Sequence, residues 1–370
     1  MATVQLFFST PTLNMASAWN LGYRGAGQNI IVMDTGVQSS HIFFQNASGA
    51  SRVTYEACFG SNATAYYPPT NTYYTVQSAC ANGAGSVLGV PRAAAPVPNC
   101  SSVDPFSCAH GTHVAGIAAG KNNPSFGLGT DFQGVAPDAN IIAVQVFSYD
   151  PNRIYPPRAI TADLVAAMQV AANAMTPGTS DNPYVVSLSL GGNPYASNCD
   201  DISDASIAFA AAVHTLTNNG VPVVAATGNN GYYGSISWPS CITGVIKVGA
   251  TANDQVGATI SSFTNRPDMS AFAGEAVYMV PGGSTTSSVA SSVPDYAFYG
   301  AVNNGVLGFA GTSQATPHVA GLYAIFKSVV PGTTIQNATA WFQQSAGTAM
   351  TPVCSAGPCQ PYYRIRLPAL

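Results

Sequence analysis

The chain has 370 residues, of which only 7% are charged. This length allows one large α/β domain or two ordinary ones, with a sizeable buried core. No stretch approaches the roughly 20 consecutive apolar residues of a membrane-spanning helix, so the low charge does not indicate a membrane protein. The net charge of −4, with 11 lysines and arginines, argues against nucleic acid as a partner, because phosphate binding requires clustered basic residues.

The first predicted element is a strand at 29–34, NIIVMD. Before it, the chain opens with MATVQLFFST, which has neither the basic nor the apolar region of a signal peptide, so an exported protein would be in a mature or trimmed form. The strand is short, β-branched and continuously apolar, which is typical of a parallel sheet covered on both faces. It ends at Asp34. Considered without the rest of the sequence, this residue is best explained as part of an Asx-type turn at the strand end. Ligands, however, gather beyond the carboxyl ends of such strands.

Residues 45–108 break the pattern and are predicted to form an irregular surface insertion, rich in Tyr, Pro, Ala and Ser. Eight cysteines occur along the chain, and their even number in loop-like surroundings indicates disulfides and an oxidising compartment. Buried free thiols are the alternative, and zinc is a weaker one because no CxxC pair exists. The cysteines fall into neighbouring pairs: Cys58 and Cys80, Cys100 and Cys108, Cys199 and Cys241, Cys354 and Cys359.

The sequence CAHGTHVAGIAAG, residues 108–120, predicts a tight helix that begins near His110. His110 and His113 are spaced i, i+3 with only Gly and Thr between them, whereas a zinc helix of the HExxH type spaces its histidines i, i+4 around a Glu. The whole chain contains two Glu, and no third ligand is evident. A metal site is therefore not predicted here, and His110 is expected as a neutral imidazole at a helix N-terminus.

Further strands are predicted at 140–147, 184–190, 221–227 and 244–250, again as short apolar runs. Helical stripes alternate with them: one covers 160–175 and another ends at Asn219–Gly220, a pair that suits a left-handed helix stop. Alternating strands and helices predict a three-layer α/β fold, with a mostly parallel central sheet and helices on both faces.

The last motif is GFAGTSQATPHVAG, residues 308–321, which places Ser313 at or just ahead of a helix start. A helix N-terminus stabilises negative charge, which is useful where an oxyanion develops, although a serine that merely caps the helix is the ordinary alternative. Residues 280–300 are predicted as a surface loop and 331–370 as a C-terminal extension that carries Cys354 and Cys359. We expect one domain over 1–370.

Taken together, VMDTGV, HGTHVAG and GTSQATPHVAG, in that order, resemble the subtilisin-like serine proteases. The stretches SLSLGG (187–192) and VVAATGNNG (223–231) are similar to the substrate-flanking strand and the oxyanion segment of that family. The resemblance spans about residues 14–330 and implies a secreted, extracellular serine endopeptidase. It makes Ser313 the nucleophile, His110 the general base and Asp34 its orienting acid, and leaves His113 a structural role one turn into the helix.

The resemblance also implies an oxyanion hole made of the Asn229 side chain and the Ser313 backbone N–H. Polypeptide substrates would add a strand alongside Ser189, Leu190 and Gly191, with the opposite wall around 152–154. The S1 pocket would be built from Ala226, Thr227 and Gly228 and from the residues before Trp238–Pro239. No Asp or Glu occurs between Ala225 and Ser240, so we expect a neutral, apolar P1 residue.

Several features depart from the family pattern. Gln314 follows the nucleophile where the family usually has an oxidisable Met, so we expect tolerance of peroxide. Phe43 occupies the place of a usual calcium ligand; one calcium site is therefore doubtful, and Asp131 is a candidate for another. Chemistry should need no cofactor. Bonds Cys100–Cys108 and Cys199–Cys241 are expected to brace the histidine loop and the S1 region.

Family members are made with an inhibitory propeptide, which is an expected partner outside this chain, and we expect a monomer. Three other interpretations are less consistent with the sequence. The complete set of catalytic residues argues against a catalytically dead fold that is used for binding. The occurrence of three motifs in the family's order argues against a disulfide-rich binding protein in which the motifs are coincidental. A zinc hydrolase would be sensitive to chelators rather than to serine-directed probes.

Overall fold

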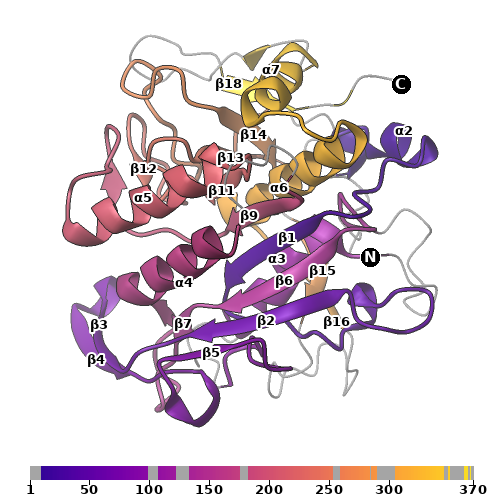
Figure 1. Ribbon diagram of the computed structural model, residues 1–370. Coiled ribbons are helices and arrows are strands. Elements are labelled where there is room, and N and C mark those ends of the chain that lie inside the picture. Colours follow the sequence, from indigo (N-terminus) through magenta and orange to yellow (C-terminus); the bar gives the residue numbers. More distant parts are fainter. Residues whose placement is uncertain are drawn as a thin grey trace.

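The central feature of the computed structural model is a ten-stranded sheet (Figure 1). The structure describes residues 10–98, 107–121, 133–175, 182–252, 259–283, 285–289, 305–345, 349–350, 362–365 and 367. Its strand order is β17-β18-β14-β13-β11-β9-β1-β6-β2-β5, parallel except at the two edge pairs β17·β18 and β2·β5. The strands are β1 (Asn29–Asp34), β2 (Val53–Phe59), β5 (Ser86–Leu88), β6 (Asn140–Gln145), β9 (Tyr184–Leu188), β11 (Val223–Ala226), β13 (Ile246–Thr251), β14 (Val277–Pro281), β17 (Ala349–Met350) and β18 (Tyr362–Arg364).

Helices cover both faces of this sheet, as the alternation along β1 illustrates. Ile30 and Val32 point into one core, shared with α3 (His110–Ala119) and α6 (Thr312–Val329). Ile31 and Met33 point into the other, shared with α4 (Thr161–Ala174) and α5 (Asp204–Asn218), which lie side by side in Figure 1. The predicted three-layer α/β fold is therefore confirmed. The chain also has α2 (Met15–Asn20) and α7 (Ile335–Ser345).

The prediction of an irregular insertion at 45–108 is wrong in part, because this segment supplies strands β2 and β5 of the main sheet. β2 lies parallel to β6 on its other side from β1. The sequence of β2 contains polar residues, which is why no strand was predicted there. In the structure, buried Glu56 accepts a hydrogen bond from the backbone of Ala94 at 3.2 Å, and Cys58 forms a disulfide with Cys80. Contacts with distant residues thus allow these side chains to be buried in a strand, although the composition of the segment is typical of a loop.

Short antiparallel ribbons form separate two-stranded sheets beside the main one. They are β3 (Ala63–Tyr67) with β4 (Thr72–Val76), β7 (Phe147–Ser148) with β8 (Arg158–Ala159), and β10 (Pro194–Tyr195) with β12 (Ile236–Ser237). Four single-turn 3₁₀ helices also occur among the described residues: Ile42–Phe44, Pro68–Thr70, Ala81–Gly83 and Ser107–Ala109. The ribbon β7·β8 follows directly on the end of β6.

The C-terminal third differs from the loop and extension that were expected. The segment 280–300 begins in β14 and includes β15 (Thr285–Val289), which pairs with β16 (Gly305–Phe309); residues 284 and 290–300 lie outside the described residues. Within 331–370, β18 pairs in parallel with β14 and so extends the central sheet. Cys354 and Cys359 lie outside the described residues. In the described part of the chain, no helix combines the length and apolar character needed to cross a membrane.

Candidate active site

A buried carboxylate and an imidazole meet at the carboxyl edge of the sheet. Asp34 ends β1 and is 1% exposed; one of its oxygens accepts the Thr35 backbone N–H at 2.7 Å and lies 2.8 Å from Nδ1 of His110. Because Nδ1 is engaged with the carboxylate, the ring is oriented with Nε2 turned away from Asp34. This geometry suits an imidazole that takes up a proton at Nε2 and is stabilised as a cation by the acid.

The first turn of α3 is held against the end of β1 by small residues. The Gly111 N–H donates to the Thr35 hydroxyl at 2.9 Å, and that hydroxyl lies 3.3 Å from the carbonyl of Cys108, to which it donates. A side chain at Gly111 would collide with the carbonyl oxygen of Gly36, so only glycine allows this approach. Cys108 is disulfide-bonded; its expected partner, Cys100, lies outside the described residues.

Ser313 is the second residue of α6, as the motif predicted. Its hydroxyl donates to the Ser189 carbonyl at 3.1 Å, and the Ser189 hydroxyl donates to the Ser313 carbonyl at 2.7 Å. This reciprocal pair fixes the start of α6 beside the end of β9. Ser189 was expected only to flank the substrate, so its contact with Ser313 is a second role that the sequence did not indicate.

Asn229 follows β11 and presents its side chain at the start of α6. Its Oδ1 accepts both the backbone N–H and the hydroxyl of Thr312, at 2.8 and 2.9 Å. With the oxygen so used, the amide Nδ2 is the end of the side chain that can donate to another group. A Cβ on Gly311 would lie 3.2 Å from that Nδ2, so glycine keeps this space clear.

Thr312 and Asn265 organise this site, and neither was predicted from the sequence. Asn265 is completely buried; its Oδ1 accepts the N–H groups of Asn230 and Tyr232 at 2.9 and 3.1 Å. Its own N–H donates to the carbonyl of Gly228 at 2.9 Å. The turn after β11, which carries Asn229, is therefore fixed from behind by a residue 35 positions further along the chain.

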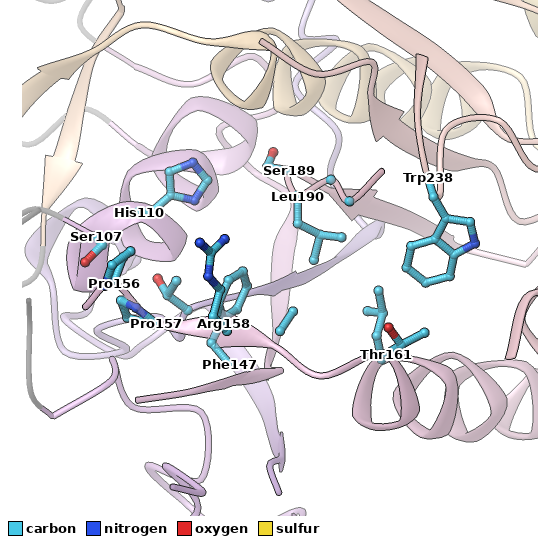
Figure 2. A pocket seen from close by; sticks show the side chains of 15 residues that line it. Ser107, His110, Phe147, Pro156, Pro157, Arg158, Thr161, Ser189, Leu190 and Trp238 are labelled. Atoms are coloured by element: carbon cyan, nitrogen blue, oxygen red, sulfur yellow. The ribbon is translucent and has the colours of Figure 1, made fainter. Parts of the chain in front are cut away.

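A cleft of about 410 Å³ leads away from His110 (Figure 2). One wall is formed by Ser189–Gly192, and Trp238 lies at the end opposite His110. The other wall is Pro156–Ala159 rather than 152–154, which corrects the expectation. The reason is local: the carboxylate of Asp150 accepts backbone N–H groups of the next residues, from Asn152 at 2.9 Å to Tyr155 at 3.0 Å, and so folds that stretch into a turn.

The segments expected to form the S1 pocket lie next to each other. The Ser237 N–H donates to the Thr227 carbonyl at 2.9 Å, and the Gly192 N–H donates to the Trp238 carbonyl at 2.7 Å. Gly228 has a positive φ of 103°, and a Cβ there would collide with the Ser237 side chain. Residues 189–192, 226–228 and 237–238 thus lie side by side; of these, 189–192 and Trp238 line the cleft, and 226–228 do not appear in its lining.

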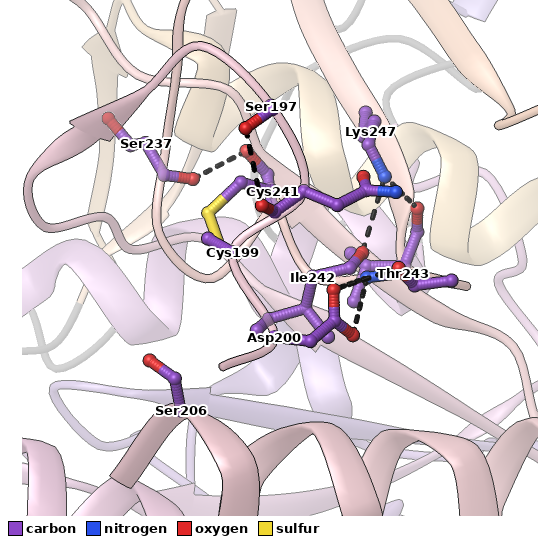
Figure 3. The surroundings of a disulfide bond; sticks show 12 residues. Ser197, Cys199, Asp200, Ser206, Ser237, Cys241, Ile242, Thr243 and Lys247 are labelled. Atoms are coloured by element: carbon purple, nitrogen blue, oxygen red, sulfur yellow. Dashed lines mark hydrogen bonds between the residues drawn. A yellow bond between two sulfur atoms is a disulfide. The ribbon is translucent and has the colours of Figure 1, made fainter. Parts of the chain in front are cut away.

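The disulfide Cys199–Cys241 lies behind this region and is present as expected (Figure 3). It joins the loop after Gly192 to the segment after Trp238. Asp200 reinforces the link, because its carboxylate accepts the Thr243 hydroxyl at 2.8 Å and the Thr243 N–H at 3.2 Å. Together these bonds join the two segments that flank the expected S1 region.

Two further histidines of the motifs are buried structural residues. His113 packs edge-on against Phe309, with ring centroids 4.5 Å apart. His318 lies in the interior of α6, with Nδ1 2.8 Å from the carbonyl of Gln314. Burial lowers the pKa of His318 to about 4, so it is neutral at physiological pH.

Phe43, which stands where a calcium ligand of the family is usually found, lies in surroundings that do not suit a cation. Phe43 is fully buried, and its ring centroid lies 6.4 Å from those of His41 and Phe44. Hard cations need oxygen ligands, which this aromatic cluster does not offer. Within the described ranges, no group of three or more His, Cys, Asp and Glu residues could hold a metal ion, and Asp131 lies outside them.

An acid–imidazole pair, a serine at a helix N-terminus and an anchored amide, all on one edge of a parallel sheet, define a hydrolase-type site of the α/β class. The sequence profile of the subtilase family matches residues 25–357. The chain therefore belongs to the subtilase family, whose members are serine proteases.

Curated relatives agree with this assignment. The chain is 27% identical over 350 residues to an extracellular protease of Xanthomonas campestris pv. campestris, covering 93% of this chain and 51% of the relative. It is 28% identical to subtilisin DY of Bacillus licheniformis, covering 88% of this chain and 85% of the relative. The chain thus spans about half the length of the first of these relatives.

Solved structures show the same fold at low identity. The CspB protease of Clostridium perfringens matches with a TM-score of 0.65 and 16% identity, over 97% of each chain. A cold-adapted subtilisin-like serine proteinase matches with a TM-score of 0.57 and 22% identity, over 93% of this chain and 89% of that one. At these identities the likeness concerns the architecture alone.

Proposed function

We propose that this chain is a secreted serine endopeptidase that hydrolyses peptide bonds through Asp34, His110 and Ser313. The observation that carries the proposal is the 2.8 Å contact between the buried Asp34 carboxylate and His110 Nδ1. A buried carboxylate is costly unless it is paired, and here its partner is an imidazole on the rim of a substrate-sized cleft. Family membership and the position of Ser313 at the start of α6 support the same assignment.

In this mechanism, His110 Nε2 takes the proton of the Ser313 hydroxyl as the Ser313 oxygen attacks the substrate carbonyl. Asp34 holds the ring orientation and stabilises the imidazolium. The protonated His110 then gives its proton to the leaving amine, and water repeats the sequence on the acyl-enzyme. The Ser313 hydroxyl must first exchange its hydrogen bond with the Ser189 carbonyl, now 3.1 Å long, for one with His110.

The negative oxygen of the tetrahedral intermediate would be held by two donors. One is Nδ2 of Asn229, which is directed by the two hydrogen bonds from Thr312 to its Oδ1. The other is the backbone N–H of Ser313, at the positive end of α6. Fixed donors of this kind stabilise the transition state without reorganisation, and none of these steps uses a metal or cofactor.

The S1 pocket is proposed to lie between residues 189–192, 226–228 and 237–238. The enzyme is expected to prefer substrates with a neutral, apolar P1 side chain. No acidic residue occurs between Ala225 and Ser240, so an Arg or Lys side chain would be buried without a counter-charge. Hydrolysis of matched peptides with Phe, Leu or Arg at P1 tests this preference. A higher kcat/KM for the Arg peptide would contradict it.

Secretion is supported by the disulfides Cys58–Cys80 and Cys199–Cys241 and by the extracellular protease among the relatives. We propose that the mature enzyme acts as a monomer on polypeptides, after removal of an inhibitory propeptide. Structural calcium, if bound, would use a site other than Phe43. Mass spectrometry of the secreted protein, with and without reduction, measures the disulfide state that this proposal requires.

The decisive experiment is labelling with a fluorophosphonate probe, followed by peptide mapping of wild type and His110→Ala. One adduct on Ser313 that is lost in the variant identifies an activated serine and its base. His113→Ala serves as the matched control, and should retain labelling if it still folds. Folded protein that forms no adduct would instead favour a binding module built on a catalytically dead fold.

A further inference from the structure

Arg158 introduces a positive charge into the proposed substrate cleft. It lies on β8, paired with Ser148 of β7, and forms part of the wall opposite Ser189–Gly192. Figure 2 shows its guanidinium end projecting into the cleft, between His110 and Leu190. Among the described residues that line this cleft, Arg158 is the sole permanently charged one. In a chain with only 11 basic residues, this placement requires an explanation.

An aromatic support from the neighbouring hairpin orients the side chain. Nε of Arg158 donates to the Tyr74 hydroxyl at 3.2 Å, and that hydroxyl donates to the Pro156 carbonyl at 3.0 Å. Tyr74 is itself stacked on Tyr155, with ring centroids 4.4 Å apart, and the guanidinium carbon lies 6.0 Å from the ring of Tyr67. The inner nitrogen is therefore used for positioning, while the two terminal nitrogens point toward the cleft.

No carboxylate of the described residues forms an ion pair with Arg158. The acid nearby in the chain, Asp150, is occupied by backbone N–H groups of the turn that follows, including those of Ile154 and Tyr155 at 2.9 and 3.0 Å. The described residues that line the cleft include no Asp or Glu either. The terminal nitrogens of Arg158 thus face a cleft whose described walls supply no counter-charge, which a carboxylate of a bound ligand could provide.

We propose that Arg158 is a specificity-determining residue that selects an acidic side chain of the substrate at P2 or P4. The inference rests on the proposed function, because it places an extended peptide along Ser189–Gly191. Side chains of an extended chain alternate between two sides, so P2 and P4 project away from the side on which P1 enters its pocket. A carboxylate there would accept a forked, charge-assisted pair of hydrogen bonds from the guanidinium.

The test uses internally quenched peptides that share an apolar P1 residue and differ only by Glu or Gln at P2, P3 or P4. Wild type should cleave the Glu peptide at P2 or P4 about fivefold faster in kcat/KM than its Gln partner, which corresponds to about 1 kcal/mol for a partly exposed ion pair. The preference should shrink in high salt. In Arg158→Gln it should vanish, whereas Arg158→Lys should keep part of it.

Arg92→Gln is the matched control, because it removes the same charge from an exposed position outside the cleft and should leave the ratio unchanged. Equal rates for Glu and Gln peptides in wild type, a preference at P3 alone, or a preference that survives in Arg158→Gln would each overturn the proposal. If no peptide is cleaved at all, the proposed protease function fails. Binding of the same peptides to Ser313→Ala then decides the inference separately: equal Kd values for Glu and Gln peptides would overturn it.

Discussion

The hydroxyl of Thr312 offers a test of how the proposed oxyanion hole is built. Thr312 is fully buried, and its hydroxyl donates to Asn229 Oδ1 at 2.9 Å and accepts the Gly228 N–H at 3.1 Å. Thr312→Val keeps the shape of the side chain and removes both hydrogen bonds. The backbone N–H of residue 312 still anchors Asn229, at 2.8 Å in the wild type. The amide should therefore be loosened rather than lost.

The expected effect follows from these contacts. Complete loss of an oxyanion donor typically lowers kcat by about 10²–10³. Loss of one of two anchoring hydrogen bonds, worth about 1 kcal/mol, should lower kcat about fivefold and leave KM nearly unchanged, because the interaction develops in the transition state. The free energy of unfolding should fall by about 1–3 kcal/mol, since the Gly228 N–H loses its partner.

A double-mutant cycle with Asn229→Ala measures this coupling. Steady-state hydrolysis of one peptide by the four proteins gives kcat and KM, and urea unfolding gives stability. In the Asn229→Ala background, Thr312→Val should have almost no further effect on kcat, because the amide it directs is gone. If Thr312→Val lowers kcat equally in both backgrounds, or raises KM alone, the reasoning is refuted.

Three further predictions concern oxidation, the disulfide and acid stability. Gln314→Met should make activity sensitive to hydrogen peroxide while wild type resists it; inactivation of both at one rate would contradict this. The double change Cys199→Ser and Cys241→Ser opens a bond between residues 42 apart, and should lower the free energy of unfolding by about 4 kcal/mol in a chain-entropy estimate, measured by urea titration. The pKa of His318 is lowered to about 4 in the folded state, so the unfolded chain binds its proton first. Stability should fall by up to about 3 kcal/mol as pH drops from about 6.5 through 4, and His318→Gln should reduce that slope whatever its stability at neutral pH.

The sequence alone was sufficient for the general fold and for the candidate catalytic residues. β1 was predicted with both ends correct, because a buried parallel strand is a continuous apolar run that ends at a polar residue. His110 and Ser313 were placed at helix starts by the small residues and the proline that follow them. These signals are local, and local physical preferences are what a single sequence records directly.

Only the tertiary structure revealed the residues that act through distant partners. Strand β2 was missed because its polar side chains are satisfied by Ala94 and Cys80, which lie far along the chain. Asn265 could not be recognised as the support of the turn that carries Asn229, since the groups it binds, in Gly228, Asn230 and Tyr232, lie more than 30 positions earlier in the chain. The cleft wall is formed by Pro156–Ala159 and not by the expected residues 152–154, because the chain around Asp150 folds into a turn. For β2 and Asn265 the deciding interaction joins groups whose proximity is set by the fold, and that proximity leaves no mark on the local pattern of residues. The turn around Asp150 is local, but only the fold decides which residues after it line the cleft.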